Sequence, residues 1–430
     1  MRLYAWLFLC FGPLAAPLAW SAAMVPLTLP AGFSATVVGA ELGNLRHVVV
    51  TDDGIIYASL RRKQSGNALV ALRDLDGDHE ADDIRYFGQY EGLGTGLELH
   101  DGYLYYSSNA AVYRQQLRPG ELLPVGPREV IATGFPTARG HDVRSMAFDG
   151  AGRMFVNFGA PSNACQDPQR TPGAPGQAPC PELERTGGIW VFEDATLGQD
   201  QMADGERFAT GLRHTMAIDW HEPTGALFGV VHGRDQLDTL WPEFYTDQQN
   251  ADLPGEEFHR FYAGFDGGWP YTYWDGLEGV RRVAPEYGGD GRKRPEAGLY
   301  ADPLLAFPAH WAPNDMIFYT GTAFPERYRG GVFVAFHGSW NRAPYPQLGY
   351  KIAFIPMDPE GNVTGPFEEF MIGFGGTEPV TTPRNAAHRP CGVAMTPDGA
   401  LIVVDSQRGY VWRVDYTAPA GEEVAHAADR

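Results

Sequence analysis

A histidine and an arginine stand together at the start of a predicted strand, in the run His141-Asp142-Val143-Arg144. Neutral imidazole takes up protons near physiological pH, so His141 is a candidate general base. A lone histidine is more often structural, and Arg144 suits either a bound carboxylate or an ion pair at the edge of a sheet. The chemistry of this run therefore depends on the residues that the fold brings beside it.

Further arginines occupy comparable positions beside short apolar segments, at Arg213, Arg342 and Arg389. Guanidinium groups pair with carboxylates, so a chain of net charge −20 that gathers arginines around one axis is suited to bind an anion. Unrelated surface ion pairs would leave the same pattern. The sequence alone keeps both interpretations open.

Two other runs are candidates for ligand binding, and one of them suits a hard cation. In the run 232–235, Gly233 either lets a backbone carbonyl approach a ligand closely or serves a tight turn. The run 74–82 places carboxylates at alternate positions with a glycine at the bend, as a calcium loop requires. A solvated acidic turn is the alternative there, and a cation in that loop need not take part in catalysis. The carboxylates concerned are Asp74, Asp76, Asp78 and Asp82.

The bulk composition indicates a turn-rich β protein. The 430 residues include 53 Gly and 34 Pro, which favour many turns and few long helices. The net charge of −20 excludes nucleic acid and anionic membrane surfaces as partners, because both need a basic face. Beyond the N-terminus the sequence predicts no membrane-spanning segment.

The N-terminus has the features of a secretory signal peptide over residues 1–23. Arg2 is basic, residues 4–18 are almost wholly apolar, and Ser21 and Ala23 are small residues at a plausible cleavage site. A membrane anchor is the alternative, but the apolar run is short for a spanning helix. We therefore expect a periplasmic or secreted protein.

An exported protein meets an oxidising compartment, where disulfides persist. Cys165 and Cys180 flank a loop rich in Pro, Gly and Gln, and we expect a disulfide between them. Cys391 would then be left over, and we expect it to be buried and inert. The chain has no Cys-X-X-Cys run, so neither a zinc ribbon nor attached haem is indicated.

A loose internal repeat organises the mature sequence: an apolar segment, a turn that usually contains Asp-Gly, and a second apolar or aromatic segment. Each copy predicts a β-hairpin, and six copies predict an all-β, six-bladed β-propeller, whose closed ring hides its sheet edges. The copies span residues 48–57, 96–105, 146–156, 216–228, 317–334 and 393–403. We expect the segment 33–38 to complete the last blade and close the ring.

Residues 24–430 are expected to form this propeller as a single domain. The segment 241–298 lacks the blade pattern and is rich in Gly, Trp, Tyr and acidic residues. We interpret it as long insertions on one face of the ring, where functional loops gather. Residues 417–430 are expected to form a disordered tail.

Residues 27–416 together resemble the soluble sugar dehydrogenases that depend on pyrroloquinoline quinone (PQQ), most closely the branch of L-sorbosone dehydrogenase-like proteins and pyranose dehydrogenases. The segments that carry the resemblance follow the family's order: 141–159, 209–213, 267–270, 318–325 and 337–342. The resemblance implies a propeller with PQQ and calcium at one end of its axis. Such an enzyme oxidises a sugar or a sugar-derived aldehyde and passes electrons to an external acceptor, a cytochrome or a quinone carrier.

The resemblance also implies roles for single residues. His141 matches the family's base, which takes the proton of the sugar hydroxyl while a hydride passes to the quinone. Arg213 matches the arginine that polarises the quinone carbonyl. Gly233 and Arg234 match the residues whose backbone carbonyls hold calcium. The other expected cofactor contacts are Arg144, His214, Arg342 and Arg389.

The chain departs from the family pattern near the base and near the key arginine. Ala160 stands where glucose dehydrogenases of the family carry an aspartate that supports the base, and Asp142 would face the other side of a strand. His214 stands where asparagine is usual. The segment between Gly233 and Glu256 is longer than in the family, so the resemblance predicts the fold more directly than it predicts the calcium ligands.

Two other functions fit parts of the sequence. A calcium-dependent propeller hydrolase, such as a lactonase, needs acidic and asparagine side chains around an axial calcium, whereas the axial candidates in this chain are mainly arginine and histidine. A binding propeller without catalysis is the other alternative, and Ala160 and His214 are its best support. The dehydrogenase interpretation requires a small sugar as substrate.

Overall fold

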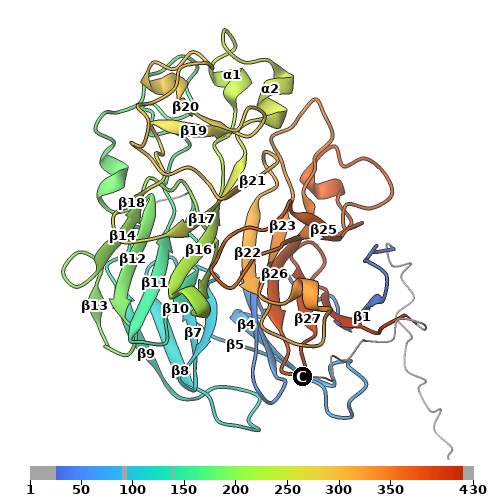
Figure 1. Cartoon of the computed structure of the whole chain (residues 1–430). Coiled ribbons are helices and arrows are strands. Elements are labelled where there is room, and N and C mark those ends of the chain that lie inside the picture. The colour runs from blue at the N-terminus through green and yellow to red at the C-terminus, as the bar shows by residue number, and fades with distance from the viewer. Residues whose placement is uncertain (1–25, 90–93, 138–139, 420–430) are drawn as a thin grey trace, which may run out of the picture.

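The chain folds as a ring of six sheets around a central axis (Figure 1). The computed structural model describes residues 26–89, 94–137 and 140–419. The first strands of neighbouring sheets contact one another around the axis, as in a propeller. The predicted six-bladed β-propeller is therefore confirmed. The predicted signal peptide lies outside the described residues, as do residues 420–430 of the predicted tail.

Each blade has four antiparallel strands, which follow one another from the axis outward. The first three blades are β2 (Leu45–Val50), β3 (Ile56–Gln64), β4 (Asn67–Arg73) and β5 (Asp83–Phe87); β6 (Leu97–His100), β7 (Tyr103–Ser107), β8 (Val112–Gln116) and β9 (Val125–Thr133); and β10 (Met146–Phe148), β11 (Arg153–Phe158), β12 (Gly188–Glu193) and β14 (Glu206–Thr210).

The last three blades are β15 (Ala217–His221), β16 (Ala226–Val231), β17 (Glu256–Phe261) and β21 (Leu305–Phe307); β22 (Pro313–Phe318), β23 (Val332–His337), β24 (Tyr350–Ile355) and β25 (Glu368–Met371); and β26 (Pro390–Met395), β27 (Leu401–Asp405), β28 (Val411–Tyr416) and β1 (Phe33–Gly39). Two short strands add parallel edges, β13 (Gln199–Asp200) on β9 and β18 (Phe265–Asp266) on β14.

The apolar core lies between the blades. Six clusters of buried residues each join two neighbouring blades, so that together they run around the whole ring. Alternate residues of a strand face opposite sides of its sheet, and each side meets a different neighbouring blade. This explains why the inner strands read as continuous apolar segments in the sequence.

The N-terminal strand closes the ring. β1 pairs in antiparallel register with β28, the third strand of the last blade. The Phe33 ring packs edge-on against Phe324 and Phe370, with centroids 4.8 and 5.0 Å away. The expectation that the segment 33–38 completes the last blade is confirmed.

The segment 241–298 is not wholly an insertion. Residues 256–261 form β17, the third strand of the fourth blade. Charged residues hide this strand in the sequence, because Glu257 is paired internally with Arg281 and His259 rather than with water. Within this region, α2 (Asp247–Asp252) and the hairpin of β19 (Thr272–Asp275) and β20 (Val280–Val283) gather beyond one end of the ring, together with α1 (Leu237–Leu240) just before it (Figure 1).

Two inner-strand carboxylates connect consecutive blades. Asp219 of β15 accepts a hydrogen bond from the Phe318 amide of β22 at 2.8 Å. Asp315 of β22 accepts one from the Val393 amide of β26 at 3.0 Å. Burial raises the pKa of Asp219 to about 7, against an ordinary value of 3.8, although these amide bonds oppose the shift.

This shift makes stability depend on pH. Between pH 4 and 7 the folded protein keeps a proton on Asp219 that the unfolded chain has lost, so the stability from this group is complete below about pH 4 and disappears as the pH rises through 7. We expect the free energy of unfolding of the native protein to fall between pH 4 and 8 by about 2–4 kcal/mol more than that of Asp219→Asn, measured by urea denaturation. The exposed Asp52→Asn is the control, and equal pH slopes for all three proteins would refute the assignment.

Candidate active site

A cavity of about 250 Å³ opens at the end of the ring where the inner strands begin. Several predicted site residues line it, although they come from distant parts of the sequence. They are His141, Arg213, His214, Gly233 and Arg389. The structure therefore brings the candidate base, the key arginine and one of the other arginines to a single pocket.

His141 is oriented by the backbone of the neighbouring strand. Its Nδ1 lies 2.6 Å from the carbonyl oxygen of Ala160. A carbonyl can only accept, so Nδ1 carries the proton and Nε2 keeps a lone pair. Ala160, which lacks the family's supporting carboxylate, thus supports the base through its main chain, while Asp142 forms an ion pair with Arg61 at 3.2 Å.

The electrostatic surroundings keep His141 neutral. Burial, and then the positive charge of Arg213, lower its pKa to about 3 from the ordinary value of 6.5. At neutral pH the imidazole of His141 therefore carries no proton on Nε2. The lone pair on Nε2 is therefore available, although a pKa this low makes the imidazole a weak base until an anion binds beside it.

A row of three neighbouring imidazoles extends from the candidate base: His214 stacks on His141 at an interplanar angle of 24°, and His232 is tilted by 50° against His214. The rings of His141 and His214 lie 4.5 Å apart, and those of His214 and His232 lie 5.0 Å apart. Burial, and then the neighbouring histidines, lower the pKa of His214 well below its ordinary value. Gly159 makes the stacking possible, since a Cβ there would come within 2.5 Å of both His141 and His214.

Arg213 is held by hydrogen bonds from several directions. Its Nη1 donates to the carbonyl of Gly233 at 2.7 Å, and its Nη2 donates to the carboxylate of Asp235 at 2.8 Å. Asn163 accepts from Nε through its carbonyl and from Nη2 through its side chain. The guanidinium group is thus fixed at the wall of the cavity by the protein itself.

Asp235 is the negative centre of this wall. Besides Arg213 it pairs with Arg170 at 3.2 Å, and His310 lies 3.9 Å away. Burial alone would raise the pKa of Asp235, but the charges of Arg213, His310 and Arg170 lower it to about 2. The carboxylate is therefore ionised throughout the neutral range.

The disulfide-bridged loop supplies part of the same wall. Cys165 and Cys180 form the predicted disulfide, and Cys391 is buried as expected, whereas its inertness stays a prediction. Asn163, two residues before Cys165, bonds to the backbone of Asp235 through both its amide and its carbonyl group. The disulfide therefore closes the loop that follows Asn163, the residue that accepts hydrogen bonds from Arg213.

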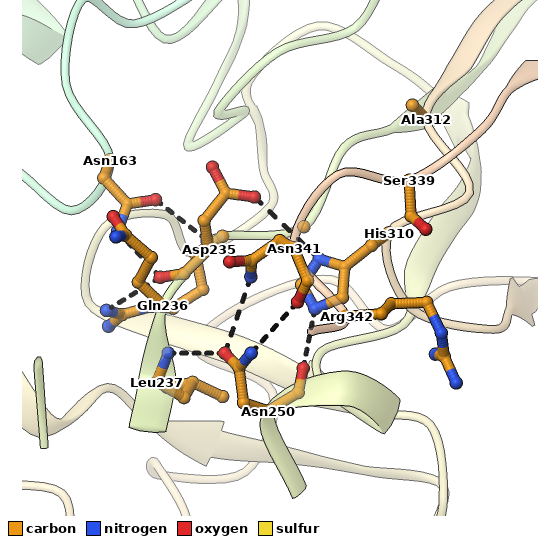
Figure 2. Close-up of polar contacts among 12 residues, drawn as sticks. Asn163, Asp235, Gln236, Leu237, Asn250, His310, Ala312, Ser339, Asn341 and Arg342 are labelled. Atoms are coloured by element: carbon orange, nitrogen blue, oxygen red, sulfur yellow. Dashed lines mark hydrogen bonds and ion pairs between the residues drawn. The ribbon is translucent and has the colours of Figure 1, made fainter. Parts of the chain in front are cut away.

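A hydrogen-bond network joins the loops around the cavity (Figure 2). The Asn250 side chain accepts from the Leu237 amide at 2.8 Å and donates to the Asn341 carbonyl at 3.0 Å. The Asn250 carbonyl accepts from His310 Nε2 at 2.7 Å. His310 has a left-handed backbone, with φ +63°, so these contacts fix a conformation that L-residues seldom adopt.

Two predicted cofactor contacts, Arg144 and Arg342, are engaged elsewhere, and so is the side chain of Arg234, whose predicted calcium contact through the backbone carbonyl stays a prediction. Arg144 is fully buried, donates to the Pro136 carbonyl at 2.7 Å and stacks on Phe158. Arg342 donates to carbonyls including that of Ala251, where α2 ends its last turn. The side chain of Arg234 pairs with the buried Glu286. None of these three guanidinium groups lines the cavity.

The register of the strands and the path of the loops explain these differences. Arg144 stands near the start of a strand whose alternate residues face opposite sides, so it cannot point the same way as His141 and also pack between blades. Arg342 follows a loop that turns away from the axis toward α2. Sequence position beside an apolar segment specifies the end of the ring but not the direction of the side chain.

The acidic loop lies at the opposite end of the ring from the cavity. Leu72 pairs with Ile56, and Ile56 pairs with Val50 at the far end of β2 from the cavity residue Arg46. The carboxylates of Asp74, Asp76 and Asp78 converge within 4.8 Å, and Asp82 accepts from the Leu75 amide. A cation in this loop stays a prediction, and it would not touch the cavity.

Calcium does not fit the Gly233 position in this arrangement. The Gly233 carbonyl already accepts from Arg213, whose positive charge would repel a second cation there. Glu256 is the nearest unassigned carboxylate of the cavity, and both of its oxygens accept backbone amides, from Gly233 and Ala312. Burial raises the pKa of Glu256 to about 7.

Sequence reasoning missed several residues of the cavity. Arg46 lies at the entrance of β2, and its Nη1 is 3.2 Å from His337 Nε2. An arginine just before an apolar inner strand is the same signal that singled out Arg389, so Arg46 was open to prediction. Asn163 and His310 carry no such signal, because long loops bring them to the site.

Comparisons with known proteins identify relatives of the chain. A family model described as TrAA12-like matches residues 27–266 and 294–417. A pyrroloquinoline quinone-dependent pyranose dehydrogenase of Coprinopsis cinerea is 30% identical over 165 residues, which cover 33% of this chain and 21% of that protein. An uncharacterized protein of Borreliella burgdorferi is 26% identical over 211 residues, 49% of each chain. The chain thus matches half or less of the length of these relatives.

Solved structures share the fold over most of the chain. The holo form of the PQQ domain of the C. cinerea pyranose dehydrogenase has a TM-score of 0.71 at 18% identity, covering 91% of this chain and 97% of that one. A Trichoderma reesei enzyme of carbohydrate-active family AA12 has a TM-score of 0.72 at 17% identity, covering 92% and 98%. The soluble aldose sugar dehydrogenase of Escherichia coli has a TM-score of 0.58 at 15% identity, covering 90% and 100%.

The ion pair at the cavity wall gives a stability prediction. Asp235→Asn keeps the shape of the side chain but leaves Arg213 without its buried counter-charge. We expect the free energy of unfolding to fall by about 3 kcal/mol, because an unpaired buried charge is costly. Asp252→Asn, which removes the partly exposed partner of Arg342, should cost less than about 1 kcal/mol in the same urea titration. Equal losses for the two variants would contradict the central place of Asp235.

Proposed function

This chain belongs to the TrAA12-like family, and on that premise we propose that it is a PQQ-dependent dehydrogenase that oxidises an aldose or a sugar-derived aldehyde. The C. cinerea relative is named for PQQ-dependent pyranose oxidation. The observation that carries the proposal is a neutral His141, with a free lone pair on Nε2, in the same cavity as several guanidinium groups.

The residues of the cavity suit PQQ, which carries three carboxylates. Arg46, Arg61, Arg213 and Arg389 line one cavity of a chain whose net charge is −20. Arg389 is directed by hydrogen bonds to the carbonyls of His337 and Gly338, at 3.0 and 3.1 Å. Guanidinium groups bind carboxylates through paired hydrogen bonds, so such a wall selects a planar polyanion.

When bound, PQQ supplies a quinone that takes up a hydride. The chain's own part is to receive the substrate's hydroxyl proton at Nε2 of His141, while Ala160 holds the ring through Nδ1. Negative carboxylates beside His141 raise its pKa from the value of about 3 that the protein alone imposes, which strengthens it as a base. Arg213, fixed by Asp235 and Asn163, offers positive charge where negative charge develops.

The remaining parts of the proposal rest on the sequence. Electrons leave to an external acceptor, since the chain has no haem-attachment motif. A periplasmic or secreted location follows from the predicted signal peptide. Among the described residues, no helix is long and apolar enough to cross a membrane.

A reconstitution assay tests the proposal. The purified protein is incubated with PQQ, with and without calcium, and then given aldoses and a redox dye. We expect bleaching of the dye only when PQQ is present. Lactone cleavage without PQQ would instead establish a hydrolase, and silence in both assays without a spectral shift of PQQ would establish a binding propeller.

His141→Ala tests the assignment of the base. Without the imidazole the substrate proton has no acceptor, so we expect the turnover number to fall by at least about 100-fold. PQQ affinity, measured by spectral titration of the same variant, should stay close to that of the native protein because the arginines remain. Retained turnover with lost PQQ affinity would assign His141 to cofactor binding instead.

A further inference from the structure

Trp340 lies at the mouth of the cavity with half of its surface exposed. It lines the same cavity as His141 and Arg213, and 51% of it is accessible to solvent. No other tryptophan among the described residues is as open to water. Single exposed apolar side chains are common on protein surfaces, so the informative feature of Trp340 is its position at the mouth of a cavity lined by polar groups, where it can contact a bound molecule.

The backbone on both sides of Trp340 is held in place. Ser339 and Asn341 are 1% and 8% exposed. The Ser339 hydroxyl donates to Gln347 at 2.8 Å and accepts from the Leu348 amide at 2.9 Å. The Asn341 carbonyl accepts from Asn250 at 3.0 Å, as Figure 2 shows. The backbone that carries the indole is therefore held in one position.

Arg342 completes this support. Its guanidinium group donates to the carbonyl of Ala251 and pairs with Asp252 at 3.3 Å, which ties the loop to α2. This is the residue that the sequence places against the cofactor. Its observed contacts make it part of the scaffold under Trp340, so the exposure of the indole results from built-in geometry rather than from a loose loop.

The surroundings of Trp340 combine an apolar face with polar groups. The guanidinium group of Arg170 lies 5.8 Å from the indole centroid and also pairs with Asp235 of the cavity wall. Deeper in the cavity the side chains are histidines, arginines and carboxylates, which can hydrogen-bond hydroxyl groups. A sugar ring needs both kinds of surface, because its hydroxyls project at the edge while one face carries C–H groups.

We propose that Trp340 is the platform on which the substrate's sugar ring stacks, and thus the residue by which this chain favours ring-closed sugars over open-chain aldehydes. The inference rests on the proposed dehydrogenase function. The electron-rich face of an indole attracts the slightly positive C–H groups of a pyranose, and it covers their apolar surface. An open-chain aldehyde has no such flat face and gains little from the indole.

Steady-state kinetics of the PQQ-loaded enzyme test this role. For an aldopyranose such as glucose, Trp340→Ala should lower kcat/KM by about tenfold, mainly through KM, while Trp340→Phe keeps most of the native value. For glyceraldehyde, an open-chain substrate, both variants should match the native enzyme within about twofold. Tyr345→Ala is the matched control, an exposed aromatic of the same loop that does not line the cavity.

Equal losses for glucose and glyceraldehyde in Trp340→Ala would mean that the indole only supports the pocket, and would overturn the proposal. Unchanged kinetics with glucose would overturn it as well. A direct measurement of sugar binding separates failure of the proposal about Trp340 from failure of the proposed dehydrogenase function. If the native protein shows no PQQ-dependent turnover, the dehydrogenase assignment fails, whereas quenching of tryptophan fluorescence by pyranoses in the native protein but not in Trp340→Phe would still support the platform.

Discussion

The buried contact between Arg213 and Asp235 is the interaction on which the rest of the site depends. Removing two charges from water is costly, and the loss is recovered only when every remaining donor and acceptor finds a partner. In this wall Arg213 also donates to the Gly233 carbonyl, to the backbone carbonyl of Asn163 and to the side-chain oxygen of Asn163. The requirement to satisfy one ion pair therefore joins the connection between β14 and β15, the segment after β16 and the segment that leads into the disulfide-bridged loop into one wall.

That wall sets the electrostatics of the cavity. Burial, together with the positive charge of Arg213 and of the neighbouring side chains, lowers the pKa of His141 and His214 and keeps both imidazoles neutral. A pocket of this kind favours an anion, because an anion both pairs with the arginines and restores proton affinity to the imidazole next to it. On the proposed function, binding of an anionic cofactor therefore strengthens the general base through charge.

The outer layer of the site depends on different contacts. Asn250 and Arg342 connect α2 with the loop that carries Trp340, and neither of them touches the cavity. The propeller positions the side chains that line the cavity. The region around α1 and α2 instead positions the loop that carries Trp340 at the mouth of the cavity. On the proposed function, substrate selection and proton transfer belong to separate parts of the chain.

The sequence by itself determined the six hairpins, the closing strand, the disulfide and the residues His141, Arg213 and Arg389, because apolar segments and turn residues record which end of a blade a side chain occupies. Strand β17 escaped detection since its charges are paired internally. Only the tertiary structure decided that Arg144 and Arg342 turn away and that Ala160 supports the base by its carbonyl. Side-chain direction and backbone acceptors depend on contacts between segments far apart in the chain, which local pattern does not encode.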